Sequence, residues 1–180
     1  LGLATAYSIL NRHEGTIEVE SGPGEGTRFT FYLPAAPDTD VTETETDISS
    51  HLGSGTILVM DDEEAMRDSL KIMLQVLGYM VMCAADGEEV LGLFRERIKA
   101  GEETRGMILD LTVAGGKGGM EIIEELREMA PGIPILVVSG YAEDPVMADP
   151  DRFGFTDSLC KPFKSSDLVR LLDKHMGAER

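Results

Sequence analysis

The sequence is poor in basic residues. Its 180 residues include 16 lysines and arginines against 33 aspartates and glutamates, which gives a net charge of −17. Because the phosphates of nucleic acids and of anionic lipids bind to basic patches, this shortage argues against either as a direct partner. No apolar run approaches the length of about 20 residues that a membrane-spanning helix needs. We therefore expect a cytoplasmic protein segment with no nucleic acid partner and no direct membrane contact.

Cysteine is scarce as well. The two cysteines, Cys83 and Cys160, lie in apolar stretches and show neither CxxC nor Cys/His spacing. They are therefore interpreted as buried thiols of a reducing compartment, and not as disulfide partners or zinc ligands. The chain also lacks an initiator methionine and the basic start of a signal peptide, since it opens with LGLATAYSIL. Such a start is typical of a piece cut from a longer protein.

Composition divides the chain into three segments. Residues 1–36 show a helical pattern followed by two alternating strand patterns, which predict a helix and an antiparallel strand pair with too little core to stand alone. Residues 37–55 contain five acids and no base, which predicts a solvated linker. In residues 56–180 apolar strand patterns alternate with amphipathic helix patterns. This alternation predicts an α/β fold, a doubly wound parallel sheet with helices on both faces.

Hydrophobic periodicity places the individual elements. In the first segment, Gly15 is predicted to take the left-handed conformation that ends the helix. In the third segment, the predicted strands are 57–60, 80–84, 107–109, 135–138 and 158–160, and the predicted helices are 63–77, 87–100, 120–129, 145–148 and 166–175.

An apolar run that ends in a carboxylate organises the third segment. The stretch is GMILDLTVAGGKGG, residues 106–119, in which Asp110 follows a predicted strand and precedes a glycine-rich loop. An acid at the carboxyl end of a buried strand lies where open α/β sheets bind their ligands. Taken alone, the stretch fits a plain strand followed by a polar turn as well as it fits a functional site. The choice between these two interpretations depends on the other strand ends.

The other predicted strands also end in polar residues. Because parallel strands end at the same edge of a sheet, the residues after them converge there although they are distant in the chain. The converging residues are Asp61 and Asp62 after the first strand, Ser139 after the fourth and Lys161 after the fifth. Each alone fits a helix cap, a turn or a surface charge, but their joint occurrence with Asp110 favours a site.

The chemistry of these side chains predicts phosphoryl transfer. Three adjacent carboxylates repel one another unless a cation compensates them, and oxygen ligands without histidine or cysteine favour Mg²⁺ over zinc. Lys161 adds a second positive charge, and Ser139 can donate a hydrogen bond to a phosphoryl oxygen. Asp110 can then act as an aspartyl nucleophile on phosphorus, while the metal, the lysine and the hydroxyl cover the oxygens of the transferred group.

Four motifs in residues 56–180, ILVMDDE, MILDLT, VVSG and LCKPF, together resemble a response-regulator receiver domain. The resemblance implies a flavodoxin-like (CheY-like), doubly wound five-stranded parallel sheet with strand order 2-1-3-4-5. It also implies that the domain takes a phosphoryl group from the phosphohistidine of a histidine kinase or phosphotransfer domain in a two-component phosphorelay. The implied site residues are the phosphoacceptor Asp110, the catalytic positions Ser139 and Lys161, and the Mg²⁺ ligands Asp61, Asp62, Asp110 and the backbone carbonyl of Thr112.

Residues 1–36 resemble the C-terminal end of a histidine-kinase ATP-binding domain, through LGL, NRHEG and SGPGEGTRFTFYLP. A kinase end, a linker at 37–55 and a receiver at 56–180 follow the order of a hybrid sensor histidine kinase, which implies a homodimeric parent protein, with or without a membrane anchor. The asparagine box, the first glycine box and the histidine-bearing helices are absent from this sequence. We therefore expect a segment that acts chiefly as a phosphoacceptor.

Two other functions fit parts of the pattern. A receiver fold can dock to a partner without being phosphorylated, but such a binding module is expected to lack the acid pair, the acceptor or the lysine. A metal-dependent phosphatase with an aspartate nucleophile carries D-x-D after its first strand, whereas Asp61 and Asp62 are adjacent. Receivers also often carry an aromatic residue three positions before the lysine, where this chain has Ser158. Phosphotransfer is the leading prediction, with the binding module as the alternative.

Overall fold

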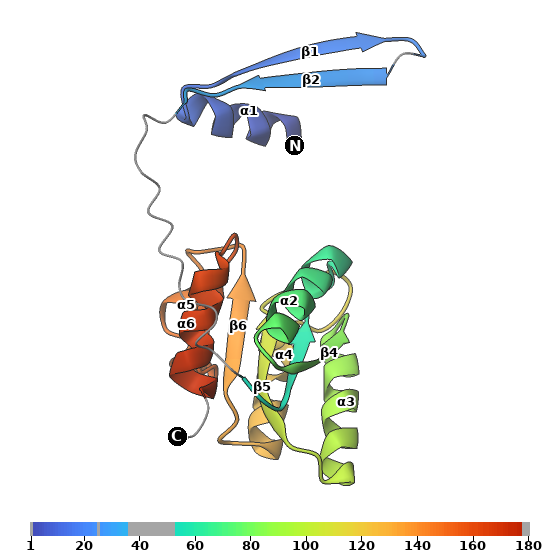
Figure 1. Cartoon of the computed structure of the whole chain (residues 1–180), viewed down its shortest axis with the longest axis vertical. Coiled ribbons are helices and arrows are strands. Elements are labelled where there is room, and N and C mark those ends of the chain that lie inside the picture. The colour runs from blue at the N-terminus through green and yellow to red at the C-terminus, as the bar shows by residue number, and fades with distance from the viewer. Residues whose placement is uncertain (1, 25, 36–52, 178–180) are drawn as a thin grey trace. The chain divides into compact units, whose positions relative to one another are not determined.

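The computed structural model describes residues 2–24, 26–35 and 53–177 (Figure 1). The chain divides into two compact units, Leu1–Thr44 and Glu45–Arg180. The linker predicted for 37–55 lies outside the described residues except for its last three positions. No helix in the described part of the chain is long and apolar enough to cross a membrane.

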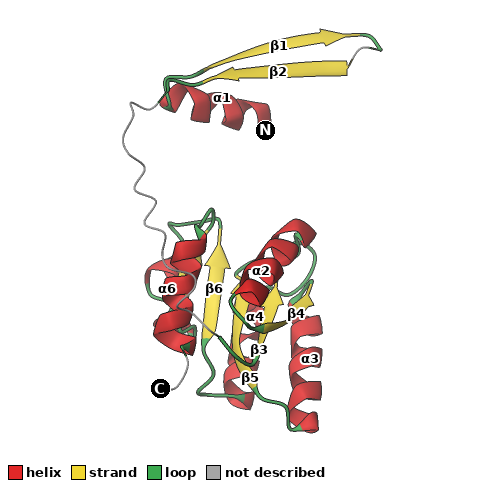
Figure 2. Ribbon diagram, in the orientation of Figure 1, coloured by secondary structure: helices red, strands yellow, loops and turns green. Residues whose placement is uncertain are grey.

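The first unit contains one helix and one β-hairpin. Helix α1 (Gly2–Arg12) is followed by the antiparallel strands β1 (Thr16–Gly22) and β2 (Gly26–Tyr32), as Figure 2 shows. This confirms the helix and the strand pair predicted from the sequence. Val19 lies opposite Phe29 on one face of the hairpin, and both side chains are exposed. The hairpin therefore presents an apolar face that the described residues of this unit do not bury.

The end of α1 differs from the prediction in one detail. The left-handed residue is Glu14, with φ 55°, and not Gly15. The amide of Gly15 donates to the carbonyl oxygen of Leu10 at 2.8 Å and so closes the last turn of the helix. Gly15 is required for space, because a Cβ atom there would lie 2.8 Å from the carbonyl oxygen of Tyr32.

The second unit is built on a five-stranded parallel sheet with helices on both faces, which confirms the predicted fold class (Figure 2). The spatial order of the strands is β4-β3-β5-β6-β7. The strands are β3 (Thr56–Met60), β4 (Met80–Ala84), β5 (Thr104–Asp110), β6 (Ile135–Ser139) and β7 (Asp157–Cys160). The helices are α2 (Glu64–Val76), α3 (Gly87–Ala100), α4 (Gly119–Met129), α5 (Pro145–Ala148), α6 (Ser165–Met176) and a 3₁₀ turn at Asp151–Phe153.

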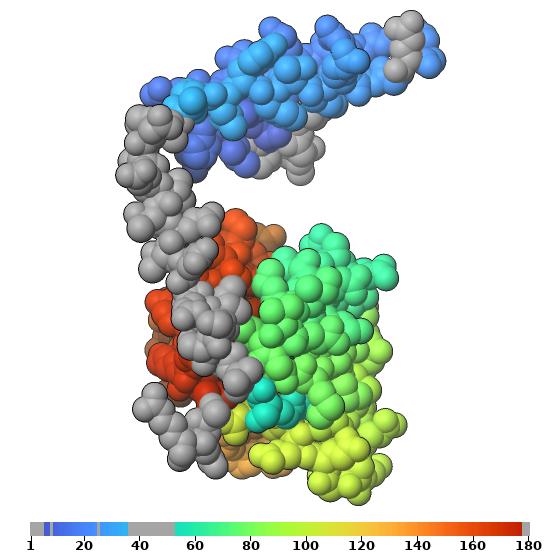
Figure 3. All heavy atoms as spheres, in the orientation of Figure 1, coloured from blue at the N-terminus to red at the C-terminus, as the bar shows by residue number. Residues whose placement is uncertain are grey.

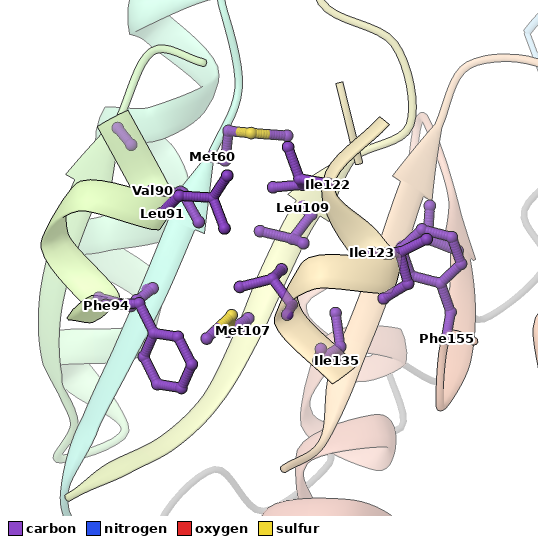
Figure 4. Close-up of a cluster of buried hydrophobic side chains, with 14 of the residues drawn as sticks. Met60, Val90, Leu91, Phe94, Met107, Leu109, Ile122, Ile123, Ile135 and Phe155 are labelled. Carbon is purple, nitrogen blue, oxygen red and sulfur yellow. The ribbon is translucent and has the colours of Figure 1, made fainter. Parts of the chain in front are cut away.

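One hydrophobic cluster lies on each face of this sheet. On one face α3 and α4 pack against the strands, and Phe94, Met107 and Ile122 belong to the cluster there (Figure 4). On the other face α2 and α6 contribute Leu74 and Leu172 to a second cluster. The outer surfaces of these two helices appear in Figure 3, α2 in green and α6 in red. Because successive side chains of a strand point to opposite faces, the fully buried strand β3 supplies both clusters.

The prediction for one cysteine is wrong. Cys83 is half-buried against the second cluster, but Cys160 is exposed, and both are free thiols. Cys160 is the last residue of β7, which forms an edge of the sheet, whereas the preceding Leu159 points into the core. An apolar sequence context therefore did not ensure burial at the end of an edge strand.

Candidate functional site

Four strand ends deliver polar side chains to one edge of the sheet. Asp61 follows β3, Asp110 ends β5, Ser139 ends β6 and Lys161 follows β7. Asp61, Asp110 and Ser139 are buried. The sheet register continues past the strands, since the amide of Lys161 donates to the carbonyl oxygen of Ser139 at 2.7 Å. The structure thus brings together the residues that the sequence predicts to converge.

The ammonium group of Lys161 is shared by two carboxylates. Its Nζ atom donates to Oδ2 of Asp61 at 2.6 Å and to Oδ2 of Asp110 at 2.7 Å. These are charge-assisted hydrogen bonds between side chains that are at most one-fifth exposed. The peptide bond between Lys161 and Pro162 is cis. The ammonium group of Lys161 thus lies between two aspartates that are 49 positions apart in the chain.

The electrostatics of this cluster are unbalanced. Burial raises the pKa of Asp110 above its ordinary value, and the nearby charge of Asp61 adds to this, although the hydrogen bond from Lys161 acts in the opposite direction. Burial alone would lower the pKa of Lys161, but its hydrogen bonds with Asp110 and Asp61 raise it. The lysine is therefore held charged, and one ammonium does not fully compensate the acids around it.

Asp62 completes a cluster that can hold a cation. Carboxylate oxygens of Asp61, Asp62 and Asp110 all lie within 4.8 Å of one another. Asp62 is exposed, and its Oδ2 accepts a hydrogen bond from the amide of Ala114 at 3.2 Å, while Oδ1 of Asp110 accepts one from the amide of Thr112 at 3.4 Å. A purely oxygen donor set with a net negative charge suits a hard divalent cation such as Mg²⁺ and does not suit zinc.

Ser139 is oriented by the backbone that follows it. Its Oγ atom accepts a hydrogen bond from the amide of Tyr141 at 3.1 Å. A hydroxyl group can accept and donate at once, so this contact leaves the hydroxyl proton available for an acceptor at the site. Tyr141 itself is exposed.

The glycine-rich loop after Asp110 packs tightly against the protein itself. A Cβ atom on Gly118 would lie 2.4 Å from the carbonyl oxygen of Leu111, and one on Gly116 would lie 2.8 Å from Cβ of Asp86. The amide of Gly87, at the start of α3, donates to the carbonyl oxygen of Lys117 at 2.7 Å. These glycines therefore allow the loop to pack closely against Leu111 at its own start and against the start of α3.

One residue at this edge was missed by the sequence argument. Arg67, near the start of α2, donates from Nη1 to the backbone carbonyl oxygens of Asp61 and Asp62. The signal in the sequence is a basic residue just inside a helix whose first turn should favour acids, because the helix dipole makes that end positive. A single residue of this kind is too weak a pattern to select without the contacts.

A doubly wound parallel sheet with an acidic cluster and a lysine at its carboxyl edge defines a receiver-type signalling domain. The model of the response regulator receiver domain family matches residues 57–173, and the chain belongs to this family. It therefore carries a receiver domain of the two-component systems.

The similarity to one known protein extends beyond the receiver domain. The chain is 36% identical over 185 residues to the sensor kinase CckA of Brucella abortus, a match that covers 94% of this chain and 18% of that protein. It is 28% identical over 119 residues to the transcriptional regulatory protein FixJ of Bradyrhizobium diazoefficiens, covering 66% of this chain and 55% of FixJ. The chain thus spans about a fifth of the length of CckA and just over half that of FixJ.

Solved structures show the same fold. The chemotaxis protein CheY4 of Vibrio cholerae superposes with a TM-score of 0.60 at 25% identity, covering 68% of this chain and 98% of CheY4. The response regulator TrrA of Thermotoga maritima, in complex with Mg²⁺ and BeF, superposes with a TM-score of 0.57 at 28% identity, covering 67% of this chain and 97% of TrrA. The second unit is therefore a CheY-like receiver domain.

Proposed function

We propose that Asp110 is the phosphoacceptor of a phosphorelay and that it receives a phosphoryl group from the phosphohistidine of a histidine kinase or phosphotransfer domain. The observation that supports this most strongly is the cluster of three carboxylates within 4.8 Å, of which two share one ammonium group. The proposed ligands of Mg²⁺ are Asp61, Asp62, Asp110 and the backbone carbonyl of Thr112. When bound, Mg²⁺ neutralises the negative charge of the acids and of the phosphoryl oxygens.

The proposed reaction is an in-line transfer. A carboxylate oxygen of Asp110 forms a bond to phosphorus as the bond between phosphorus and the histidine nitrogen breaks, and the electron pair of that bond stays on the imidazole. Lys161 exchanges its hydrogen bond to Asp110 for one to a phosphoryl oxygen, and it keeps its bond to Asp61. The hydroxyl group of Ser139 donates a hydrogen bond to another phosphoryl oxygen. Both donors are prepositioned by strand ends, which limits the reorganisation that the transfer requires.

Labelling with a small phosphodonor tests this assignment. Incubation of the chain with acetyl phosphate and Mg²⁺ is expected to add one phosphoryl group to the intact mass, and chelation of Mg²⁺ is expected to prevent it. Asp110→Asn should abolish the gain, whereas Glu121→Gln, which changes an exposed acid in the first turn of α4, should leave it unchanged. A mass gain that persists in Asp110→Asn would contradict the proposal.

We further propose that the chain comes from a homodimeric, cytoplasmic hybrid sensor histidine kinase, with residues 1–36 as the end of its ATP-binding domain, 37–55 as linker and 56–180 as a flavodoxin-like receiver of strand order 2-1-3-4-5. Two observations support this. The similarity to the sensor kinase CckA covers 94% of this chain, and the hairpin of the first unit leaves Val19, Phe29 and Phe31 exposed, as expected of part of a larger core. Because most of the phosphate and base pocket lies outside residues 1–36, calorimetry should show no ATP binding by this segment in isolation, and micromolar affinity would contradict that expectation.

A further inference from the structure

The turn that carries Asp61 and Asp62 is held by a side chain from the helix that follows it. Nη1 of Arg67 donates to the carbonyl oxygen of Asp61 at 2.6 Å and to that of Asp62 at 3.1 Å. Within the turn, Oδ1 of Asp61 accepts a hydrogen bond from the amide of Glu63 at 2.9 Å. The carbonyl groups of Asp61 and Asp62 and the amide of Glu63 are thus all hydrogen-bonded to side chains.

Stabilisation of the helix does not explain a cation at this place. Arg67 is the fourth residue of α2, and its guanidinium points back toward the helix start, where the helix dipole already places positive charge. The side chain is also half-buried, which costs part of its hydration. The two carbonyl contacts therefore account for its position better than any benefit to α2.

We propose that Arg67 is a positioning residue for the cation site. It fixes the backbone of the turn, and it thereby sets the direction in which Asp61 and Asp62 present their carboxylates toward Asp110. This inference rests on the proposed function, because it requires that these acids bind Mg²⁺. Groups that orient metal ligands without touching the metal often matter nearly as much as the ligands themselves.

Two roles of Arg67 predict opposite signs. If only its charge mattered, its removal would strengthen cation binding, since a positive charge near the site repels the metal. If it positions the turn, its removal should weaken cation binding, since the ligands lose their common orientation. The sign of the change in affinity therefore separates the two roles.

A titration with Mn²⁺, followed by the electron paramagnetic resonance signal of the free ion and by competition with Mg²⁺, measures this sign. Arg67→Met is expected to raise the dissociation constant about tenfold. Arg67→Lys keeps the charge but donates from a single point, so an increase of only about threefold is expected. Lys71→Met removes an equal charge from an exposed position one turn further along α2, and it should leave the constant unchanged or slightly lower it.

The outcomes are distinguishable. Arg67→Met that binds Mn²⁺ as tightly as the wild type, or more tightly in the manner of Lys71→Met, would overturn the positioning role. If circular dichroism shows Arg67→Met to be unfolded, Arg67→Lys decides the question, with weaker binding in favour and unchanged binding against. A folded wild type that fails to bind Mn²⁺ would overturn the proposed function, and the role of Arg67 with it.

Discussion

The two ends of β7 carry ion clusters that are built from the same kinds of side chain in opposite proportions. At the start of the strand, Oδ2 of Asp157 is shared by Nζ of Lys174 and Nε2 of His175, each at 2.8 Å. Just past its end, Nζ of Lys161 is shared by Asp61 and Asp110 at 2.6 and 2.7 Å. The first cluster has one acid for two basic groups, and the second has one base for two buried acids.

This difference in proportion shifts the pKa values of the two aspartates in opposite directions. Burial alone would raise the pKa of Asp157, but hydrogen bonds from Lys174, His175 and the amide of Ser158 together lower it to about 2. The pKa of Asp110 is instead raised, because burial outweighs its contact with Lys161. One cluster is therefore electrostatically satisfied within the protein, whereas the other gains from an added cation and from a new acceptor for its lysine.

The largest expected effect is that of removing the lysine. Lys161→Met leaves two buried carboxylates without their shared cation, and breaking a buried ion pair in this way costs about 3 kcal/mol or more of unfolding free energy. Urea unfolding without divalent cation should show this loss, and added Mg²⁺ should restore more stability in the variant than in the wild type.

A surface lysine provides the control for this comparison. Lys99→Met, at an exposed position near the end of α3, should change the unfolding free energy by no more than about 0.5 kcal/mol. If Lys161→Met were as mild as Lys99→Met, the cluster at Asp110 would not be electrostatically unbalanced, and the contrast between the two ends of β7 would fail.

The next effect falls on the balanced cluster. Asp157→Asn keeps a side-chain oxygen but loses the charge that pairs with Lys174, and we expect a loss of about 1.5 kcal/mol at neutral pH after allowance for partial exposure. Because the pKa of Asp157 is lowered on folding, its contribution is present above its ordinary pKa of 3.8 and is lost as the pH falls toward about 2. The difference in unfolding free energy between wild type and variant should therefore shrink over this range.

An exposed aspartate tests whether the loss of stability is specific to Asp157. Asp149→Asn, just after α5, should have little effect on stability at any pH. A constant difference between wild type and Asp157→Asn from neutral pH down to acid would show that the charge of Asp157 is not the source of its contribution.

The elements of the receiver domain follow from local patterns, and the ion clusters do not. Helix α3 spans Gly87–Ala100 as predicted, because a regular apolar face and a following glycine mark both its type and its end. Strand β5 begins at Thr104, before the predicted start at 107, since its first residues are polar and hide the strand in the sequence. The contacts of Asp157 with α6 join residues 17 and 18 positions apart, for which no periodic signal exists.

The site was predictable only because the topology was. Asp61, Asp110 and Lys161 converge since parallel strands end at one edge, so recognising the alternation of strands and helices was enough to place them together. Arg67 contacts the backbone carbonyls of Asp61 and Asp62 from a helix, and the sequence gives no rule for the direction of such a side chain. What the sequence argument missed is therefore a contact that supports the cluster, whereas it placed the clustered side chains themselves at the same sheet edge.

A smaller effect, of opposite sign, is expected at Asp110, the proposed phosphoacceptor. Because the pKa of Asp110 is raised on folding, the stabilising contribution of its neutral form is present below its ordinary pKa of 3.8 and is lost as the pH rises through the raised value. At neutral pH its charge is a net cost, so Asp110→Asn should raise the unfolding free energy, by about 1 kcal/mol or less. A loss of stability in urea unfolding would contradict this, and Asp157→Asn, which should lose stability, is the matched comparison.

The smallest effect lies between the two clusters, in the middle of β7. The hydroxyl group of Ser158 donates to the carbonyl oxygen of Met147 in α5 at 2.9 Å, so Ser158→Ala should cost about 0.5 kcal/mol of unfolding free energy. Ser69→Ala, whose hydroxyl bonds to the carbonyl of its own exposed helix, should cost almost nothing. Neither change touches a group at Asp110, so labelling by acetyl phosphate should proceed at the wild-type rate in both. A slower rate in Ser158→Ala alone would mean that the hydrogen bond between β7 and α5 affects the acid cluster at Asp110. The two ends of the strand would then not act independently.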